Sequence, residues 1–454
     1  MVKVTPFKTC SWYALYYSLC EQPYFFFLDS SDSTSLCSEY SMMGCRPYLH
    51  IQSEEQGTNL KYRHGKVDQV DDDALSFLND TLSSIELPDE AYGFPVGGAV
   101  GYIGYEAAKQ FQDFNWMSHQ SKIPNVQFGF YDVVYVLEHR SKTLYKVEVS
   151  LCPDTQAVSQ ELDMISASSK PAFLLGFQVE KPVVSLTYEQ YKSAVDAVLD
   201  YIRKGDIYQV NFSYKVDAPF SGSLRAIYDR LRDVSPAPYS SFLSFDDFSV
   251  FSSSPECFVD IRHQTIKTLP IKGTVSRGGT DEEDLALKET LLLSEKDAAE
   301  LLMIVDLERN DLARVCKQST VHVPDLKRLE TYAQVHHLVS TVQGELRDDC
   351  SHVDAVATLF PGGSITGAPK IRAMEIIDEL ETSARSVYTG IIGCFGFNKF
   401  SQFNIAIRTI YAHNGVLSFH IGSGVVVDST PEKEWEETRV KAKGMLEALM
   451  IGGW

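Results

Sequence analysis

The chain has 454 residues, 44% of them hydrophobic, and carries 61 Asp and Glu against 41 Lys and Arg, a formal net charge of −20. This composition is typical of a globular protein that is long enough to bury extensive cores. The acidic excess and the lack of a basic run of five or more exclude the usual nucleic-acid scaffolds, because phosphate backbones bind clustered Lys and Arg.

The cysteines and the N-terminus indicate the compartment. The nine cysteines form no C-x-x-C pair and no metal-ligand spacing with His, so we expect reduced thiols. The N-terminal sequence MVKVTPFKTCSWYALYYSLC lacks the apolar stretch and cleavage site of a signal peptide, and no segment reaches the roughly 18 apolar residues that cross a bilayer. We therefore expect a cytoplasmic protein with no membrane segment.

The first part of the chain predicts β-structure. Residues 1–165 contain short aromatic-rich runs such as YFFFLDSS at 24–31 and FGFYDVVYVLEHR at 128–140, which are typical of strands. The pattern gives way to Ser, Ala, Pro and Lys between about 153 and 185. We interpret this stretch as a boundary, which leaves an N-terminal β-rich region over 1–165 and a second region over 185–454.

A helix and a strand follow the boundary. Thr187 and Gln190 form a capping box, and apolar residues then recur at helical spacing until Gly205. The next segment, 207–214, has the alternation of a strand. Its polar residues Gln209, Asn211 and Ser213 share one face, which looks either into a cavity or into water.

Two predicted helices carry paired acids. Asp297 and Glu300 are one turn apart on the first, while Glu434, Glu437 and Lys441 share one face of the last. If the two helices face each other, the four carboxylates make an oxygen-rich pocket suited to Mg²⁺. Solvated surface acids give the same pattern, and Glu437 with Lys441 is also an ordinary i,i+4 pair.

Four further features carry candidate chemistry. Lys272, in LPIKGTVSRG, is either exposed or, if desolvated, a nucleophilic amine. The loop PGGSITGAPK at 361–370 leads into a helix and leaves backbone N–H groups for an anion, but it is not a Walker A motif. Arg408, in the apolar strand FNIAIRTI, calls for a carboxylate or phosphate, and His337 is either a core residue or a substrate contact.

Ordered motifs over residues 185–450 resemble a known family. They are KGDIYQVNFS, SSSPECF, PIKGT, AELLMIVDLERNDLARV, HHLVSTVQGEL, FPGGSITGAPKIRAMEIIDELE, YTGIIG, FNIAIRTI and GSGVVVDS. The family is that of the chorismate-utilising enzymes, which comprises anthranilate synthase component I, aminodeoxychorismate synthase component I, and the isochorismate and salicylate synthases. The resemblance implies an α+β fold with two large, packed, mainly antiparallel sheets flanked by helices.

The resemblance also implies the site residues, with chorismate as substrate and Mg²⁺ as cofactor. Glu300 and Glu437 match direct ligands of the ion, and Asp297 and Glu434 lie close behind them. Glu256, in SPECF, matches the general acid that protonates the departing hydroxyl. The substrate-binding positions correspond to Gln209, Thr274, His337, Ser364, Thr366, Tyr388, Arg408, Lys441 and the backbone of Gly422, Ser423 and Gly424.

Two positions distinguish the branches of the family. Gln209 stands where the water-using members have a lysine base, which favours ammonia as the nucleophile. Lys272 in PIKGT is similar to the aminodeoxychorismate synthases, whereas anthranilate synthases typically have PIAGT. The resemblance thus implies a transferase that forms 4-amino-4-deoxychorismate, for p-aminobenzoate and folate synthesis, through a covalent intermediate on Lys272. Anthranilate synthase component I and a non-catalytic chorismate-binding regulator remain as alternatives.

The N-terminal region is similar to the part that holds tryptophan in relatives. FFLDSS would supply Leu28 and Ser30 to such a pocket, although Glu39 replaces a frequent arginine. The chain has no G-x-C-x-G nucleophile elbow. We therefore expect ammonia to come from a separate glutamine amidotransferase subunit (component II), docked on the N-terminal region.

Overall fold

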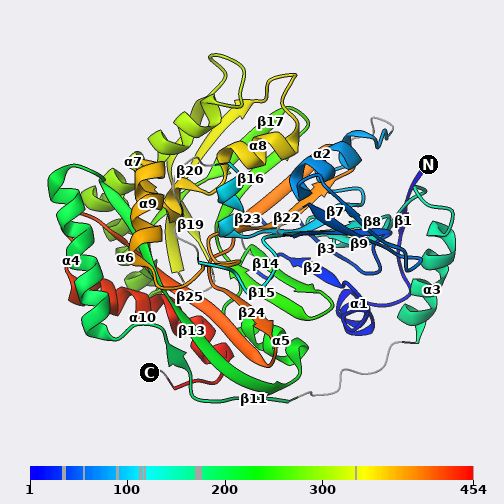
Figure 1. Cartoon of the computed structure of the whole chain (residues 1–454), viewed down its shortest axis with the longest axis horizontal. Helices are drawn as coiled ribbons and strands as arrows, with labels where there is room; N and C mark the ends of the chain where they lie inside the picture. The colour runs from blue at the N-terminus through cyan, green and yellow to red at the C-terminus, as the bar shows by residue number, and fades with distance from the viewer. Residues whose placement is uncertain are drawn as a thin grey trace.

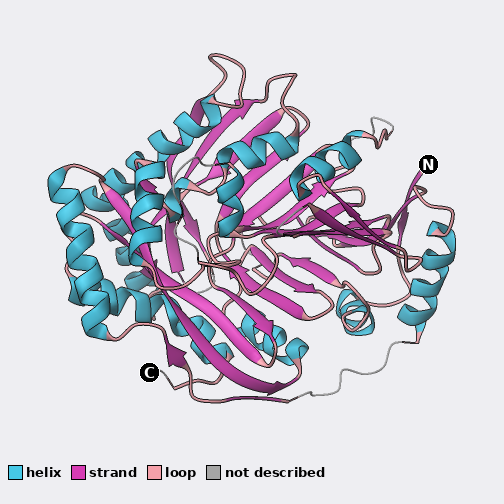
Figure 2. Ribbon diagram, in the orientation of Figure 1, coloured by secondary structure: helices cyan, strands magenta, loops and turns pink. Residues whose placement is uncertain are grey.

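The computed structural model describes residues 1–32, 37–54, 57–87, 92–111, 116, 119–168, 176–332 and 335–452. Two large antiparallel sheets form the centre of the molecule and helices cover the outside (Figure 2). This arrangement confirms the α+β fold class expected from the sequence.

The first sheet has thirteen strands among the described residues. Its main path is β1 (Val2–Pro6), β10 (Thr143–Val149), β9 (Val133–Glu138), β3 (Tyr40–Gly44), β2 (Phe26–Asp29), β14 (Tyr239–Ser244), β15 (Phe248–Ser254), β24 (Thr409–His413), β25 (Val416–Val425), β13 (Gln209–Gly222) and β11 (Phe177–Val179). The short strands β12 (Val183–Val184) and β21 (Gly367–Ala368) also pair with β13.

The second sheet has twelve strands in the same described part of the chain. Its path is β18 (Ile271–Ser276), β20 (Val335–Glu345), β17 (Thr265–Leu269), β16 (Cys257–Arg262), β23 (Phe400–Ile405), β22 (Ile391–Gly396), β7 (Gly98–Ile103), β8 (Val126–Tyr131), β4 (Leu49–Ser53), β5 (Thr58–Tyr62) and β6 (Val67–Val70). The strand β19 (His322–Thr331) adds to the outer side of β20.

Helices gather at both ends of the sheets (Figure 1). At one end lie α4 (Tyr188–Lys204), α6 (Asp281–Leu293), α7 (Glu295–Ala313), α9 (Lys370–Leu380) and α10 (Pro431–Ala448). The remaining helices are α1 (Trp12–Leu19), α2 (Ala74–Ser83), α3 (Thr155–Ala167), α5 (Leu224–Val234) and α8 (His352–Leu359), with 3₁₀ turns η1 (Tyr105–Gln110) and η2 (Gly363–Ile365). None of the helices in the described residues is long and apolar enough to cross a membrane.

Both sheets combine strands from the two regions that the sequence distinguishes. In the first sheet β2 pairs with β14, and in the second β7 pairs with β22. Aromatic residues join the sheets face to face, since the ring of Tyr102 on β7 lies 6.1 Å from that of Phe248 on β15. One hydrophobic core therefore runs through both regions.

The structure confirms the helix ends that the sequence predicts in the second region. Thr187 and Gln190 make the capping box of α4, and Gly205 ends this helix in the left-handed conformation. Thr430 caps α10. Residues 155–167, inside the stretch interpreted as a boundary, instead form α3.

Arg408 was wrongly predicted to lie within a strand. The segment FNIAIRTI is divided between β23 and β24, and Arg408 stands in the connection with a φ of +50°. A left-handed backbone at a residue with a Cβ atom breaks strand pairing, because it turns the chain out of the extended conformation.

Candidate functional site

Lys272 lies on β18, which pairs with β20 so that Lys272 is opposite Leu338 and Thr274 is opposite His337. The Lys272 side chain is half-buried. Burial lowers the pKa of its ammonium group, and the charge of Lys441 lowers it further. The carboxylates of Glu256, Glu300 and Glu437 act on the pKa in the opposite direction. The net direction favours the neutral amine, the form of a lysine that can act as a nucleophile.

Glu256 stands in the connection between β15 and β16 and is buried. Ser364 of η2 donates a hydrogen bond of 2.7 Å to Oε1 of Glu256. Burial raises the pKa of this carboxyl, while the bond from Ser364 and the charge of Lys272 act against the rise. A carboxyl whose pKa is raised by burial is suited to general-acid chemistry.

Gln209 begins β13 and its side chain is buried, so its face looks inward and not into water. Neither its amide nitrogen nor its amide oxygen has a hydrogen-bond partner among the described residues. A Cβ atom on Gly424, in the neighbouring strand β25, would lie 3.4 Å from Nε2 of Gln209. A buried amide without partners is costly unless a ligand satisfies it, which marks this position as a binding candidate.

His337 is buried and Arg408 is half-buried, and Arg408 is near enough to His337 to act on its pKa. Burial lowers the pKa of His337 to about 4, and the charge of Arg408 adds to this effect. Nδ1 of His337 lies 2.8 Å from the hydroxyl of Thr274, and its buried Nε2 has no partner among the described residues. Burial also lowers the pKa of Arg408, whose side chain makes no hydrogen bond or ion pair within the described residues.

The glycine-containing segment of β25 approaches other elements closely. A Cβ atom on Gly422 would lie 2.7 Å from the hydroxyl of Tyr388, so only glycine fits there. Nζ of Lys441 donates a long hydrogen bond of 3.4 Å to the carbonyl of Gly422. The hydroxyl of Ser423 lies 3.0 Å from that of Tyr191 in the core. Because this side chain is engaged there, Ser423 can contribute to a binding site only through its backbone.

Thr366 uses its hydroxyl within the glycine loop. It is fully buried and donates a hydrogen bond of 2.9 Å to the carbonyl of Gly362. Because its single hydroxyl proton is already engaged, we interpret Thr366 as a residue that stabilises the loop carrying Ser364.

The four predicted metal-binding acids lie on α7 and α10. Glu437 forms an ion pair of 2.7 Å with Lys441, and Glu300 lies 3.7 Å from Lys296. Glu434 accepts a hydrogen bond of 2.6 Å from Ser429 through Oε1, while its buried Oε2 has no partner among the described residues. Asp297 lies against Gly273 of β18, next to Lys272.

Carboxylate oxygens are the ligands that Mg²⁺ prefers, and the unpartnered oxygen of Glu434 is consistent with such an ion. Within the described ranges, no group of three or more acids, histidines or cysteines is close enough to hold a metal ion as it stands. The donor set nevertheless fits Mg²⁺ in its chemistry, because all four side chains are carboxylates.

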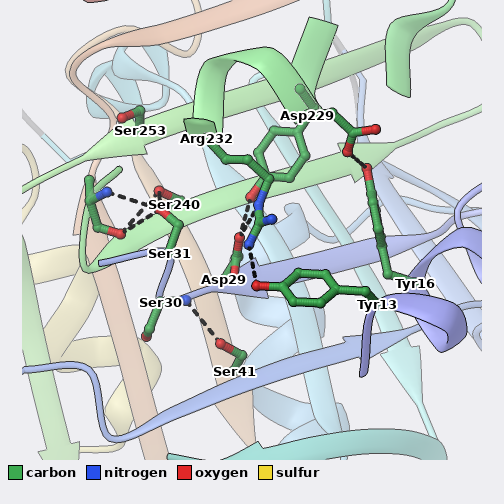
Figure 3. A network of polar contacts seen from close by, with 12 residues as sticks. Tyr13, Tyr16, Asp29, Ser30, Ser31, Ser41, Asp229, Arg232, Ser240 and Ser253 are labelled. Atoms are coloured by element: carbon green, nitrogen blue, oxygen red, sulfur yellow. Dashed lines mark hydrogen bonds and ion pairs between the residues drawn. The ribbon is translucent and has the colours of Figure 1, made fainter. Parts of the chain in front are cut away.

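Leu28 and Ser30 line a separate cavity of about 30 Å³ between the sheets, together with Tyr40, Pro238 and Asn404. Figure 3 shows the polar network beside it, in which Ser30 donates its N–H to Ser41 and Arg232 binds Asp29 at 2.9 Å. Glu39 is exposed and pairs with Arg262, so it adds no charge to this cavity. Tryptophan binding here stays a prediction.

The sequence did not predict a buried charged cluster that lies close to Glu256. Glu308 on α7 accepts a hydrogen bond of 3.3 Å from Thr268, and its pKa is raised to about 7 by burial and by the carboxylate of Asp311. Lys370 pairs with Asp311. The sequence pattern that could have indicated this cluster is the spacing of the acids at 297, 300, 308 and 311. It places all four near one face of a single helix.

Comparison with known proteins shows the family to which the chain belongs. A family model described as "chorismate binding enzyme" matches residues 24–447. The chain belongs to this family. Aminodeoxychorismate synthase component 1 of Bacillus subtilis is 37% identical over 427 residues, covering 91% of this chain and 89% of that protein. Anthranilate synthase component 1 of Acetivibrio thermocellus is 34% identical over 450 residues, covering 94% and 90%.

A solved structure agrees with this assignment. Anthranilate synthase component I from Streptococcus pneumoniae superposes with a TM-score of 0.78 at 30% identity, covering 90% of this chain and 93% of that one. The chain is therefore an enzyme of the chorismate-utilising family, as its motifs suggested. Relatives from two branches have comparable identities, so the family alone does not select the reaction.

Proposed function

We propose that this chain is the synthase component of aminodeoxychorismate synthase, which converts chorismate and ammonia to 4-amino-4-deoxychorismate. The observation that carries the proposal is the position of Lys272, whose half-buried amine has a lowered pKa and feels the charge of Glu256, Glu300 and Glu437. The similarity to the Bacillus subtilis aminodeoxychorismate synthase supports the same branch.

The proposed chemistry has two displacements. In the first, Nζ of Lys272 forms a bond to C2 of chorismate, the ring double bonds shift, and the C4–O bond breaks as Glu256 donates a proton to the departing hydroxyl, which leaves as water. In the second, ammonia forms a bond to C4, the double bonds shift back, and the C2–Nζ bond breaks. A proton from the new amine returns to Glu256, which restores the enzyme.

Binding of the dianionic substrate is assigned to groups around this lysine. Arg408 and Tyr388 would hold the enolpyruvyl carboxylate, while Lys441 and the backbone of β25 from 422 to 424 would hold the ring carboxylate. Glu300 and Glu437, with Asp297 and Glu434 behind them, would hold Mg²⁺. The ion would neutralise the ring carboxylate and polarise the substrate. Gln209 and His337 offer to the ring substituents polar atoms that have no partner in the part of the chain that the structure describes.

We also propose that a glutamine amidotransferase subunit supplies ammonia to this chain, because the proposed reaction consumes ammonia. Free ammonium salts should then replace the partner in a test with the purified chain.

The decisive experiment incubates the purified chain with chorismate, Mg²⁺ and ammonium chloride, with and without aminodeoxychorismate lyase. We expect p-aminobenzoate only when the lyase is present. Anthranilate fluorescence without the lyase would instead identify an anthranilate synthase, a candidate that the Acetivibrio thermocellus relative favours. Unchanged chorismate in both reactions would indicate a chorismate-binding regulator.

Lys272→Ala tests the covalent step. We expect amination to fall by at least about 100-fold, because the nucleophile is lost. Lys267→Ala is the matched control, since Lys267 lies on β17, which also pairs with β20. Without ammonium, wild-type protein mixed with chorismate should gain the mass of chorismate less one water. Full activity of Lys272→Ala would exclude the covalent intermediate.

A further inference from the structure

A second cavity lies behind Tyr388, between η1 and the end of α9. Its volume is about 20 Å³, which is room for one water-sized ligand, and its lining includes Tyr105, Glu106, His119, Asp378, Glu381 and Arg385. The predicted site residues are absent from this lining. Its size suits a small ligand, and the chemistry of its walls indicates which one.

The walls carry more acids than bases. Glu106, Asp378 and Glu381 line the cavity together with Lys109 and Arg385. Arg385 is ion-paired with Glu381 at 2.6 Å, which leaves Glu106 and Asp378 against Lys109. Buried Glu106 accepts hydrogen bonds from the backbone N–H groups of Arg385, at 2.7 Å, and Ser386, at 3.0 Å. Burial nevertheless raises the pKa of Glu106 to about 7. The excess of carboxyl groups favours a small cation over an anion.

Two polar atoms at this cavity lack partners. Tyr105 is only 3% exposed, and its hydroxyl makes no hydrogen bond within the described residues. Nε2 of His119 is likewise buried without a partner there. A buried hydroxyl or imidazole nitrogen without a hydrogen bond costs free energy. A ligand with N–H groups would donate the hydrogen bonds that these two atoms lack.

One guanidinium separates the cavity from the substrate side. Arg385 lies over the ring of Tyr105 at 4.7 Å and within 5.6 Å of the ring of Tyr388. It also donates a hydrogen bond of 2.6 Å to the carbonyl of Asn211, whose side-chain amide reaches the Tyr388 hydroxyl at 3.5 Å. The cavity thus adjoins the wall that holds Tyr388 and the polar face of β13.

We propose that this cavity binds an ammonium ion and holds the nitrogen nucleophile next to the wall formed by Arg385 and Tyr388. The inference rests on the proposed function, which consumes ammonia. The four N–H groups of the ion match the carboxylate oxygens and the hydroxyl of Tyr105. Transfer of one proton to a carboxylate oxygen of Glu106 breaks an N–H bond, forms an O–H bond and leaves neutral ammonia.

Tyr105→Phe and Glu106→Gln, in the full-length chain, test this site. We expect the KM for ammonium chloride to rise at least about 5-fold in each variant, with the KM for chorismate within about 2-fold of wild type. Tyr131→Phe is the matched control, because Tyr131 is also a buried tyrosine and its hydroxyl binds the carbonyl of Tyr24 far from the cavity. An unchanged KM for ammonium in Tyr105→Phe would overturn the proposal.

A binding measurement separates this inference from the proposed function. Ammonium chloride should raise the unfolding temperature of the wild-type protein above its value in sodium chloride of equal ionic strength. The difference between the two salts should shrink in Tyr105→Phe and persist in Tyr131→Phe. No difference in wild type would refute the site. A clear difference in a protein that never aminates chorismate would refute the proposed function alone.

Discussion

Burial sets the protonation of the side chains around Lys272. It lowers the pKa of Lys272 and of His337 and raises that of Glu256, because each charged form loses solvation. Each shift moves its group toward the neutral form. These are the directions that a lysine nucleophile, an uncharged hydrogen-bonding imidazole and a general acid require.

Ser364→Ala should shift the pH dependence of turnover. The hydrogen bond from Ser364 lowers the pKa of Glu256, so its removal lets that pKa rise. The acid then keeps its proton to higher pH, and the alkaline limb of kcat moves upward by several tenths of a pH unit to about one. Rates measured from pH 6 to 9 would test this. A limb that stays in place or moves down would contradict the role of Glu256 as the acid.

His337→Gln should make the protein less sensitive to acid. The pKa of His337 is about 4 in the fold against about 6.5 when unfolded, so the unfolded chain binds more protons between these values. Stability from the neutral imidazole is present above pH 6.5 and is lost as the pH falls toward 4. Between pH 7 and pH 5 the wild type should lose about 2 kcal/mol more than the variant. Urea unfolding at both pH values measures this, and equal losses would contradict it.

At the scale of elements, one glycine allows the strand that carries Lys272 to pack closely against two helices. Gly273 follows Lys272 with a φ of +75°, and a Cβ there would lie 2.9 Å from Leu291 and 3.0 Å from Asp297. The absence of a side chain lets β18 approach both α6, which carries Leu291, and α7, which carries Asp297. This contact places the strand of Lys272 beside Asp297.

Gly273→Ala should lower the free energy of unfolding by about 2–4 kcal/mol, through backbone strain and overpacking together. Gly415→Ala separates the two causes. Gly415 has a φ of +74°, but nothing lies within 4 Å of a Cβ there, so we expect about 1 kcal/mol from strain alone. Urea unfolding of both variants gives the comparison. Equal losses would show that the contact of β18 with α6 and α7 carries no packing strain.

At the scale of the whole molecule, neither region completes a sheet without the other. The pairings of β2 with β14 and of β7 with β22 would leave long unpaired edges in either fragment. Residues 1–168 and 185–454, expressed separately, should therefore aggregate or remain unfolded, and their co-expression should restore a folded complex. Circular dichroism and size-exclusion chromatography would show this. A folded, monomeric 185–454 fragment would contradict it.

Sequence patterns decided the features that depend on neighbouring residues. The cap of α4 and its glycine stop, the acids of α7 and α10, and the strand that carries Lys272 all follow from local spacing, because a helix or strand turns a short repeat into a face. The ordered motifs also indicated the family, which the match over residues 24–447 confirmed.

Only the tertiary structure decided which of these faces meet. The shared sheets, the left-handed turn at Arg408, the inward amide of Gln209 and the cavity at Tyr105 depend on segments hundreds of residues apart. Burial then sets each pKa, and burial is a property of the whole packing and not of any local pattern. The sequence alone thus determined the elements and their candidate chemistry. The long-range packing determined the pKa shifts of the side chains, the contacts between elements and the cavities.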